Sequence, residues 1–219
     1  MTTAPRSPVA ASIILGAAVG VFGVSFGVLA VASGLSVAKT CALSLLVFTG
    51  ASQFAAVGVI GTGGSALAAI GSALLLAARN GAYGLVLAPD IRGPWWRRLV
   101  AAQLVLDETT AMATAQPTRP ARVRAFWATG IAVFLCWNIG TLLGALGGGV
   151  IGDPAALGLD AAFPAGFVVL MAPHVRRLEG KVAAALGAGI ALVLVPLTPP
   201  GVPIIAAGAA CLVGLWRRP

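Results

Sequence analysis

Charge is what this sequence has least of. Only 9% of its 219 residues are Asp, Glu, Lys or Arg, whereas a soluble domain carries about 25%, because its surface must face water. Hydrophobic residues make up 59% of the chain. This composition excludes an ordinary soluble enzyme. It predicts an all-α membrane protein, a polytopic bundle of transmembrane helices.

Residue types that build catalytic and metal sites are also scarce. The chain has one His, three Cys and six acidic residues. Cys41, Cys136 and Cys211 are isolated in separate apolar segments, without the paired spacing of a zinc site or a disulfide framework. We therefore expect no metal, no cofactor and no enzymatic activity, since too few groups could converge on one catalytic site.

Basic residues outnumber acidic ones, and their placement is informative. Fourteen Lys and Arg give a net charge of +8, and most lie in short clusters between long uncharged stretches. The clusters are Arg92, Arg97 and Arg98; Arg119, Arg122 and Arg124; Arg176, Arg177 and Lys181; and Arg217 and Arg218. Such clusters are typical of loops beside membrane spans. No basic stripe with interleaved aromatic residues indicates nucleic-acid binding.

Uncharged runs predict the membrane spans. A helix needs about 20 apolar residues to cross roughly 30 Å of hydrocarbon. The runs predict spans within residues 7–38, 40–60, 65–88, 125–150, 161–175, 182–197 and 203–216, of which 65–88 contains one charged residue, Arg79. Residues 99–116 could also span but carry two acids in their middle. We expect this stretch to enter or line the bundle without crossing it, which gives about seven spans, with eight as the alternative.

The distribution of Lys and Arg favours the count of seven. With the N-terminus outside, seven spans place nearly all loop Lys and Arg in the cytoplasm and leave Arg6 outside, whereas eight spans move one cluster outward. We therefore predict a multi-pass protein of the bacterial inner (plasma) membrane, with the N-terminus outside and the C-terminus cytoplasmic.

The chain also suggests an internal repeat within one domain, 1–219. After a short tail, 1–8, residues 9–98 and 125–219 each begin with a Gly-rich span and continue into a span broken by small residues or Pro, with 99–124 as the link. In the predicted topology these halves are inverted repeats, as in many secondary transporters. Chance similarity between Gly- and Ala-rich spans is the competing explanation. The recurring glycines themselves indicate close helix packing.

Arg79 is the most unusual residue of the apolar segments. A charged side chain near the centre of a span costs about 2.5–3.5 kcal/mol on insertion scales. Tyr83 lies one helical turn beyond Arg79, and together with Asn80 it completes a short polar face. This face could bind a substrate carboxylate, or Arg79 could pair with an acid from another helix. The alternative is an Arg that extends to the lipid headgroups.

Asp107 and Glu108 are adjacent acids. On a helix they point about 100° apart, so one can pair with Arg79 or a proton while the other meets water. Carboxylates that are partly withdrawn from water exchange protons readily, which proton coupling requires. The alternative is a solvated acidic patch on an interfacial helix.

A third candidate region follows Gly50. The Gly-Ala-Ser stretch permits local unwinding, and Ser52 and Gln53 could form hydrogen bonds with an amino-acid-like ligand. Contacts between helices are the alternative role. We assign structural roles to Asp160, which is placed as an N-cap, and to Pro164, which interrupts a helix.

Four of these motifs occur in the order and spacing of one family. They are Gly50-Ala51-Ser52-Gln53; Arg79-x-x-x-Tyr83-Gly84 with Ala88-Pro89; Asp107-Glu108; and Leu159-Asp160-x-x-Phe163-Pro164-Ala165. Together they resemble the AzlC family of branched-chain amino acid export permeases, over about residues 14–215. Members often have Asn-x-Arg-His in the third span, where this chain has Ala77, Arg79 and Asn80.

The resemblance implies a secondary transporter that exports hydrophobic amino acids, driven by the proton gradient. It also implies a small, separately encoded membrane partner of the AzlD type. The missing His weakens any His-based proton step. The alternative function is a channel-like or accessory membrane subunit without proton coupling.

Overall fold

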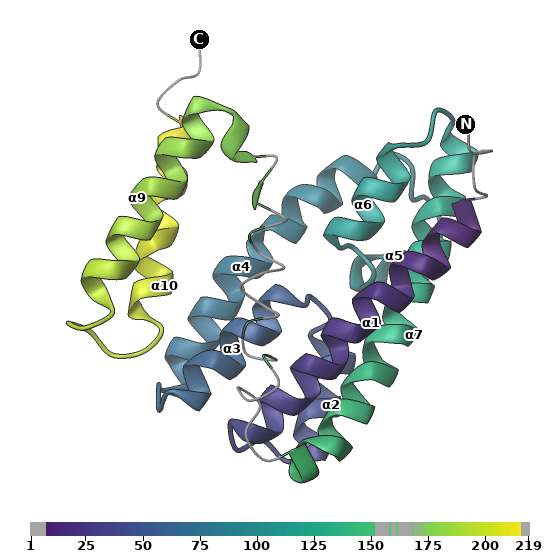
Figure 1. The fold of residues 1–219 in the computed structure, drawn as a ribbon. Coiled ribbons are helices and arrows are strands. Elements are labelled where there is room, and N and C mark those ends of the chain that lie inside the picture. The colour runs from purple at the N-terminus through teal and green to yellow at the C-terminus, as the bar shows by residue number, and fades with distance from the viewer. Residues whose placement is uncertain are drawn as a thin grey trace, which may run out of the picture.

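The computed structural model describes residues 8–151, 158, 161, 168, 171–172 and 174–215, and this part of the chain is helical without any strand (Figure 1). The elements are α1 (Pro8–Ala32), α2 (Val37–Leu46), α3 (Ala51–Gly61), α4 (Ala66–Leu87), α5 (Trp95–Gln103), α6 (Asp107–Thr114), α7 (Arg119–Ile151), η2 (His174–Arg176), α9 (Leu178–Leu194), α10 (Val202–Ala207) and η3 (Gly208–Leu215). The predicted all-α membrane bundle is confirmed.

Three of the described helices are long and apolar enough to cross a membrane. They are α1, α4 and α7, and they confirm the first, third and fourth predicted spans. The shorter α9 and the α10–η3 segment coincide with the last two predicted spans. Most of the predicted span 161–175, together with Asp160 and Pro164, lies outside the described residues.

Helices α1 and α7 form the centre of the bundle and run parallel. Gly16 lies against Ala132, Gly20 against Cys136, and Gly148 against Val28. The residue numbers of the contacting pairs therefore increase in the same direction along both helices. Figure 1 shows the two helices side by side. Small residues let the two backbones approach closely. The close packing predicted from the recurring glycines is therefore present.

The segment after α1 does not cross the bundle. Helices α2 and α3 have 10 and 11 residues, or roughly 15 Å each, which is about half of the hydrocarbon thickness. A methyl group at Gly61, the last residue of α3, would lie 2.6 Å from the Oγ of Ser33, just after α1. The chain thus returns to the end where it entered. The predicted single span 40–60 is wrong, and residues 37–61 form a re-entrant hairpin, the first hairpin.

Helices α5 and α6 form a second hairpin, residues 95–114. The loop before α5 lies beside the start of α7, because Arg119 donates to the carbonyl of Asp90 at 3.3 Å and Arg122 lies 3.6 Å from the Asp90 carboxylate. This segment also enters and leaves at one end. The expectation that residues 99–116 do not cross is confirmed, with an interruption at 104–106 that the sequence analysis did not predict.

The two hairpins enter from opposite ends, and their tips meet. The Gln103 side chain, at the end of α5, donates to the carbonyl of Leu45 at 2.9 Å, near the end of α2. Along α7, the second hairpin contacts Gly130 through Leu104. The first contacts Phe134 through Phe48, with ring centroids 4.9 Å apart. Both tips therefore lie near the middle of α7.

This arrangement corrects the predicted topology. We call the end with Pro8, Asp90 and Arg119 the basic end; Ser33 and Gly61 mark the far end. Because α1 and α7 are parallel, the start of α1 lies at the same end as the Arg119 cluster. The predicted topology, with these two on opposite sides, is wrong because the first hairpin had been counted as a crossing. If residues 9–98 and 125–219 were inverted repeats, their first helices, α1 and α7, would run in opposite directions. The parallel direction of α1 and α7 does not fit this expectation.

The C-terminal helices pack beside α4. Gly201 lies against Ala68, and Gly208 lies against Leu75, so α10 and η3 run parallel to α4. Ser72 donates to the carbonyl of Gly201 at 3.4 Å. Helix α9 packs on α10 and η3, with Gly187 against Ala207.

Candidate functional site

The candidate site lies where the tip of the second hairpin reaches α4. Arg79 of α4 and Asp107, the first residue of α6, form an ion pair, with Nη1 and Oδ2 2.6 Å apart. The Asp107 side chain is 16% exposed and that of Arg79 is 33% exposed. An acidic partner from another helix was one of the three possibilities that we considered for Arg79. We call these two residues together with Tyr83 the ion-pair site.

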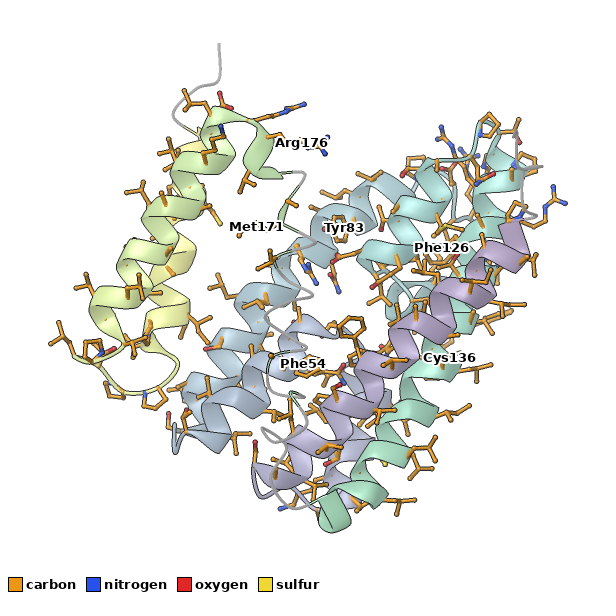
Figure 2. The ribbon with its side chains drawn as sticks, viewed as in Figure 1. Phe54, Tyr83, Phe126, Cys136, Met171 and Arg176 are labelled. Carbon is orange, nitrogen blue, oxygen red and sulfur yellow. The ribbon has the colours of Figure 1, made fainter. Side chains whose placement is uncertain are left out.

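Tyr83 lies one turn after Arg79, on the part of α4 that is next to α6 (Figure 2). It interacts with the same carboxylate. The second carboxylate oxygen of Asp107, Oδ1, is buried and has no hydrogen-bond partner among the described residues. A buried oxygen without a donor is unfavourable unless a ligand or proton satisfies it. The site therefore offers a guanidinium, a phenol and one unused carboxylate oxygen.

Local structure explains why two acids stand at this tip. Asp107 and Glu108 occupy the first turn of α6, where the positive end of the helix dipole favours negative charge. The hydroxyl of Thr109 accepts from the N–H of Leu106 at 2.8 Å and donates to the carbonyl of Leu104 at 2.8 Å. This side chain therefore satisfies backbone groups exposed by the interruption between α5 and α6.

Glu108 and Asn80 are half-buried neighbours of the pair. In the described part of the chain, no ion pair or hydrogen bond joins either side chain to Arg79 or Asp107. Their predicted roles, Glu108 in proton coupling and Asn80 in substrate binding, stay predictions.

Ser52 and Gln53 are fully buried at the start of α3. The Gln53 side chain accepts from the N–H of Gly50 at 3.1 Å and donates to the carbonyl of Leu43 at 3.0 Å. Gly50 itself has a φ of 56°, a left-handed conformation that favours glycine. Gln53 thus closes the interruption between α2 and α3. Substrate binding by Ser52 and Gln53 stays a prediction, and no hydrogen bond between described residues joins them to the ion pair.

Sequence reasoning missed two polar residues of the hairpin tips, Thr109 and Gln103. Thr109 stands three positions after Leu106, as Gln53 stands three after Gly50. That spacing is the one at which a side chain can reach back to the backbone N–H that precedes a helix, and it could have identified Thr109. Gln103, a polar residue in an apolar stretch, gave no comparable signal, because its partners lie in another hairpin.

The basic end has the features of a membrane–water interface. Trp95 and Trp96 are exposed at the start of α5, and the guanidinium of Arg97 lies 5.6 Å from the ring centre of Trp127. Aromatic and basic side chains concentrate at this level of membrane proteins. Among the described residues, no group of three or more His, Cys, Asp or Glu could hold a metal ion.

Comparison with known proteins gives one family match. A family model described as "AzlC protein" matches residues 14–151. Two relatives, both named "uncharacterized membrane protein" and found in two strains of Helicobacter pylori, are each 27% identical over 177 residues, which cover 80% of this chain and 77% of the relative. No solved structure gives a significant match.

Proposed function

Because the chain belongs to the AzlC family of transport-associated membrane proteins, we propose that it is a secondary active transporter that exports branched-chain or other hydrophobic amino acids. A small AzlD-type membrane subunit is the proposed partner, and the proton gradient is the proposed driving force. The Arg79–Asp107 ion pair is the observation that carries this proposal.

An ion pair at the tip of a re-entrant hairpin is costly to build. Charged side chains at membrane depth usually mark substrate or ion pathways. Irregular backbone is tolerated there only where protein or a water-filled cavity surrounds it. Both features coincide at Asp107, which follows the interruption at 104–106 directly. This coincidence supports a transport site at the ion pair.

The pair also provides a way to couple substrate to protons. A zwitterionic amino acid can place its carboxylate on Arg79 and its ammonium on the unused oxygen of Asp107. A proton on Asp107 removes the negative charge that the ammonium requires. Proton and substrate then exclude each other at one carboxylate, which is the condition for antiport. Glu108, one residue away, would relay the proton.

The distribution of Arg supports one orientation in the membrane. The described Arg clusters around Arg92, Arg119 and Arg176 precede or follow helices that start or end at the basic end. Cytoplasmic loops of membrane proteins carry the excess of Lys and Arg. We therefore place the basic end, and with it the start of α1, in the cytoplasm.

Leucine efflux from preloaded vesicles tests the proposal. The wild-type chain is co-expressed with the proposed partner, and efflux is measured with and without an imposed proton gradient. Asp107→Asn, Glu108→Gln and the double variant are compared, with Glu179→Gln of α9 as the control. We expect the gradient to accelerate wild-type and control efflux, and the double variant to lose this acceleration.

Three results would contradict parts of the proposal. Gradient-driven efflux retained in both single variants and in the double variant would overturn the proton role. Wild-type efflux that ignores the gradient would favour the channel-like or accessory alternative. Absence of leucine, isoleucine and valine efflux in the presence of the partner would overturn the substrate class.

A further inference from the structure

A cavity of about 400 Å³ opens at the basic end, between the end of α4, the loop that follows it, and α5. Ligand sites in proteins commonly have volumes of about 300–1,000 Å³. Its lining includes Leu87, Ile91, Arg92, Arg98 and Val105. The cavity thus combines two cations with an apolar wall.

The two arginines of the cavity are uncompensated. Arg92 and Arg98 are exposed and take part in no ion pair within the described residues. By contrast, the neighbouring Arg119 and Arg122 both form ion pairs with Asp90. The Nε of Arg92 donates to the carbonyl of Pro89 at 3.2 Å, which orients the guanidinium and leaves its terminal nitrogens for another group. A planar guanidinium binds a carboxylate through two donors.

One wall of the cavity suits a cation. It is formed by Gly84, Leu87 and Ala88, the end of α4. The carbonyl groups of a final helical turn form the negative end of the helix dipole, which stabilises positive charge nearby. An ammonium group can therefore bind beside the end of α4, and a carboxylate can bind to Arg92 or Arg98.

The inner wall is apolar. Leu87, Ala101 and Val105 line the cavity with side chains that are at most 8% exposed. A branched aliphatic side chain gains free energy by burial against such a wall, at about 25 cal/mol per Å². A charged or strongly polar side chain would lose its hydration there without gaining a partner.

The cavity adjoins the ion-pair site along the chain. Gly84 directly follows Tyr83, and Val105 precedes Asp107 by two residues. We propose that this cavity is the cytoplasmic vestibule that first binds the exported molecule, a zwitterionic amino acid with an apolar side chain, and delivers it to Arg79 and Asp107. The inference rests on the proposed transport function and adds a separate recognition step with its own residues, Arg92 and Arg98.

Cysteine protection tests the vestibule without requiring transport. Cys41, Cys136 and Cys211 are replaced by Ala, and Ala102→Cys is introduced at the cavity wall. The variant is first checked for wild-type helical content by circular dichroism. It is then labelled with a membrane-impermeant maleimide from the side of the basic end. We expect leucine to slow labelling. Two leucine analogues each lack one charged group: 4-methylpentanoate has no ammonium, and 3-methylbutylamine has no carboxylate. Each analogue should need an at least about tenfold higher concentration to slow labelling equally, because a lost charged contact commonly costs that factor in affinity.

Arginine variants then test the carboxylate contact. Arg92→Gln/Arg98→Gln should raise the leucine concentration for half-protection, and the KM of efflux, by roughly tenfold or more while the maximal rate changes little. Arg92→Gln and Arg98→Gln are also measured singly, and Arg124→Gln is their matched control, because it removes one positive charge from the same end without lining this cavity.

The outcomes separate the two proposals. Leucine protection and KM that do not change in the double arginine variant would overturn the vestibule, and so would labelling that leucine never slows; efflux by the wild type would then still support the transport function. Protection that depends on both arginines, without any leucine efflux by the wild type, would support the vestibule and contradict the proposed transport.

Discussion

At the scale of single residues, the Arg79–Asp107 pair is the ion pair that joins α4 to α6 in the described part of the chain. Breaking a buried pair by removing one partner leaves an uncompensated charge and costs about 3–5 kcal/mol, whereas neutralising both partners is much less costly. Arg79 is one-third exposed, at 33%, so the pair is only partly buried and this penalty is smaller. The stability of the protein should therefore depend on the pair as a unit.

A double-mutant cycle tests this dependence. We expect Asp107→Asn and Arg79→Gln each to destabilise the purified protein by about 1–3 kcal/mol, and the double variant to recover at least half of the larger loss. Unfolding in detergent, followed by circular dichroism, measures the effect. Glu108→Gln is the control, because Glu108 makes no ion pair in the described part of the chain, and it should change stability less. Strictly additive losses would contradict a direct interaction.

At the scale of elements, the sequence predicted the long helices well and the hairpins only in part. Apolar length alone identifies α1, α4 and α7, but residues 40–60 have the same length and composition as a span. Their interruption depends on Gly50 and on the bond from Gln53 to Leu43, and hydropathy does not detect such a contact. The candidate site, too, could be predicted only in part. The sequence indicated an acidic partner for Arg79, but only the position of the second hairpin's tip shows that this partner is Asp107.

The contact between α1 and α7 yields a prediction at this scale. A methyl group at Gly144 would overlap the carbonyl of Val24, whereas one at Gly147, on the same helix, would meet nothing within 4 Å. Gly144→Ala should therefore destabilise the protein by about 1–3 kcal/mol, since overpacking forces the helices apart. Gly147→Ala should leave it unchanged or slightly more stable, because Ala favours a helix over Gly by up to about 1 kcal/mol. Equal effects of the two substitutions on thermal unfolding would contradict the observed packing.

At the scale of the whole molecule, the described part contains two units with the same order of elements. The two units enter the bundle from opposite ends. Residues 37–87 form a hairpin followed by the spanning helix α4, and residues 95–148 form a hairpin followed by the spanning part of α7. The tips meet where Gln103 bonds to Leu45. In transporters, opposed units with interrupted helices commonly form the site around which access alternates. The tip contact lies between the basic end and the far end.

Accessibility of single cysteines tests this architecture as a whole. In a background without native cysteines, Gly34→Cys and Gly63→Cys should both react with an impermeant maleimide from one side of the membrane, because the first hairpin returns to the end where it entered. Gly93→Cys should react only from the other side, which we propose to be the cytoplasmic one. A crossing segment at 40–60 would instead place Gly34 and Gly63 on opposite sides. Right-side-out and inside-out vesicles distinguish the two arrangements, and labelling of Gly34→Cys and Gly63→Cys from opposite sides would contradict the re-entrant hairpin.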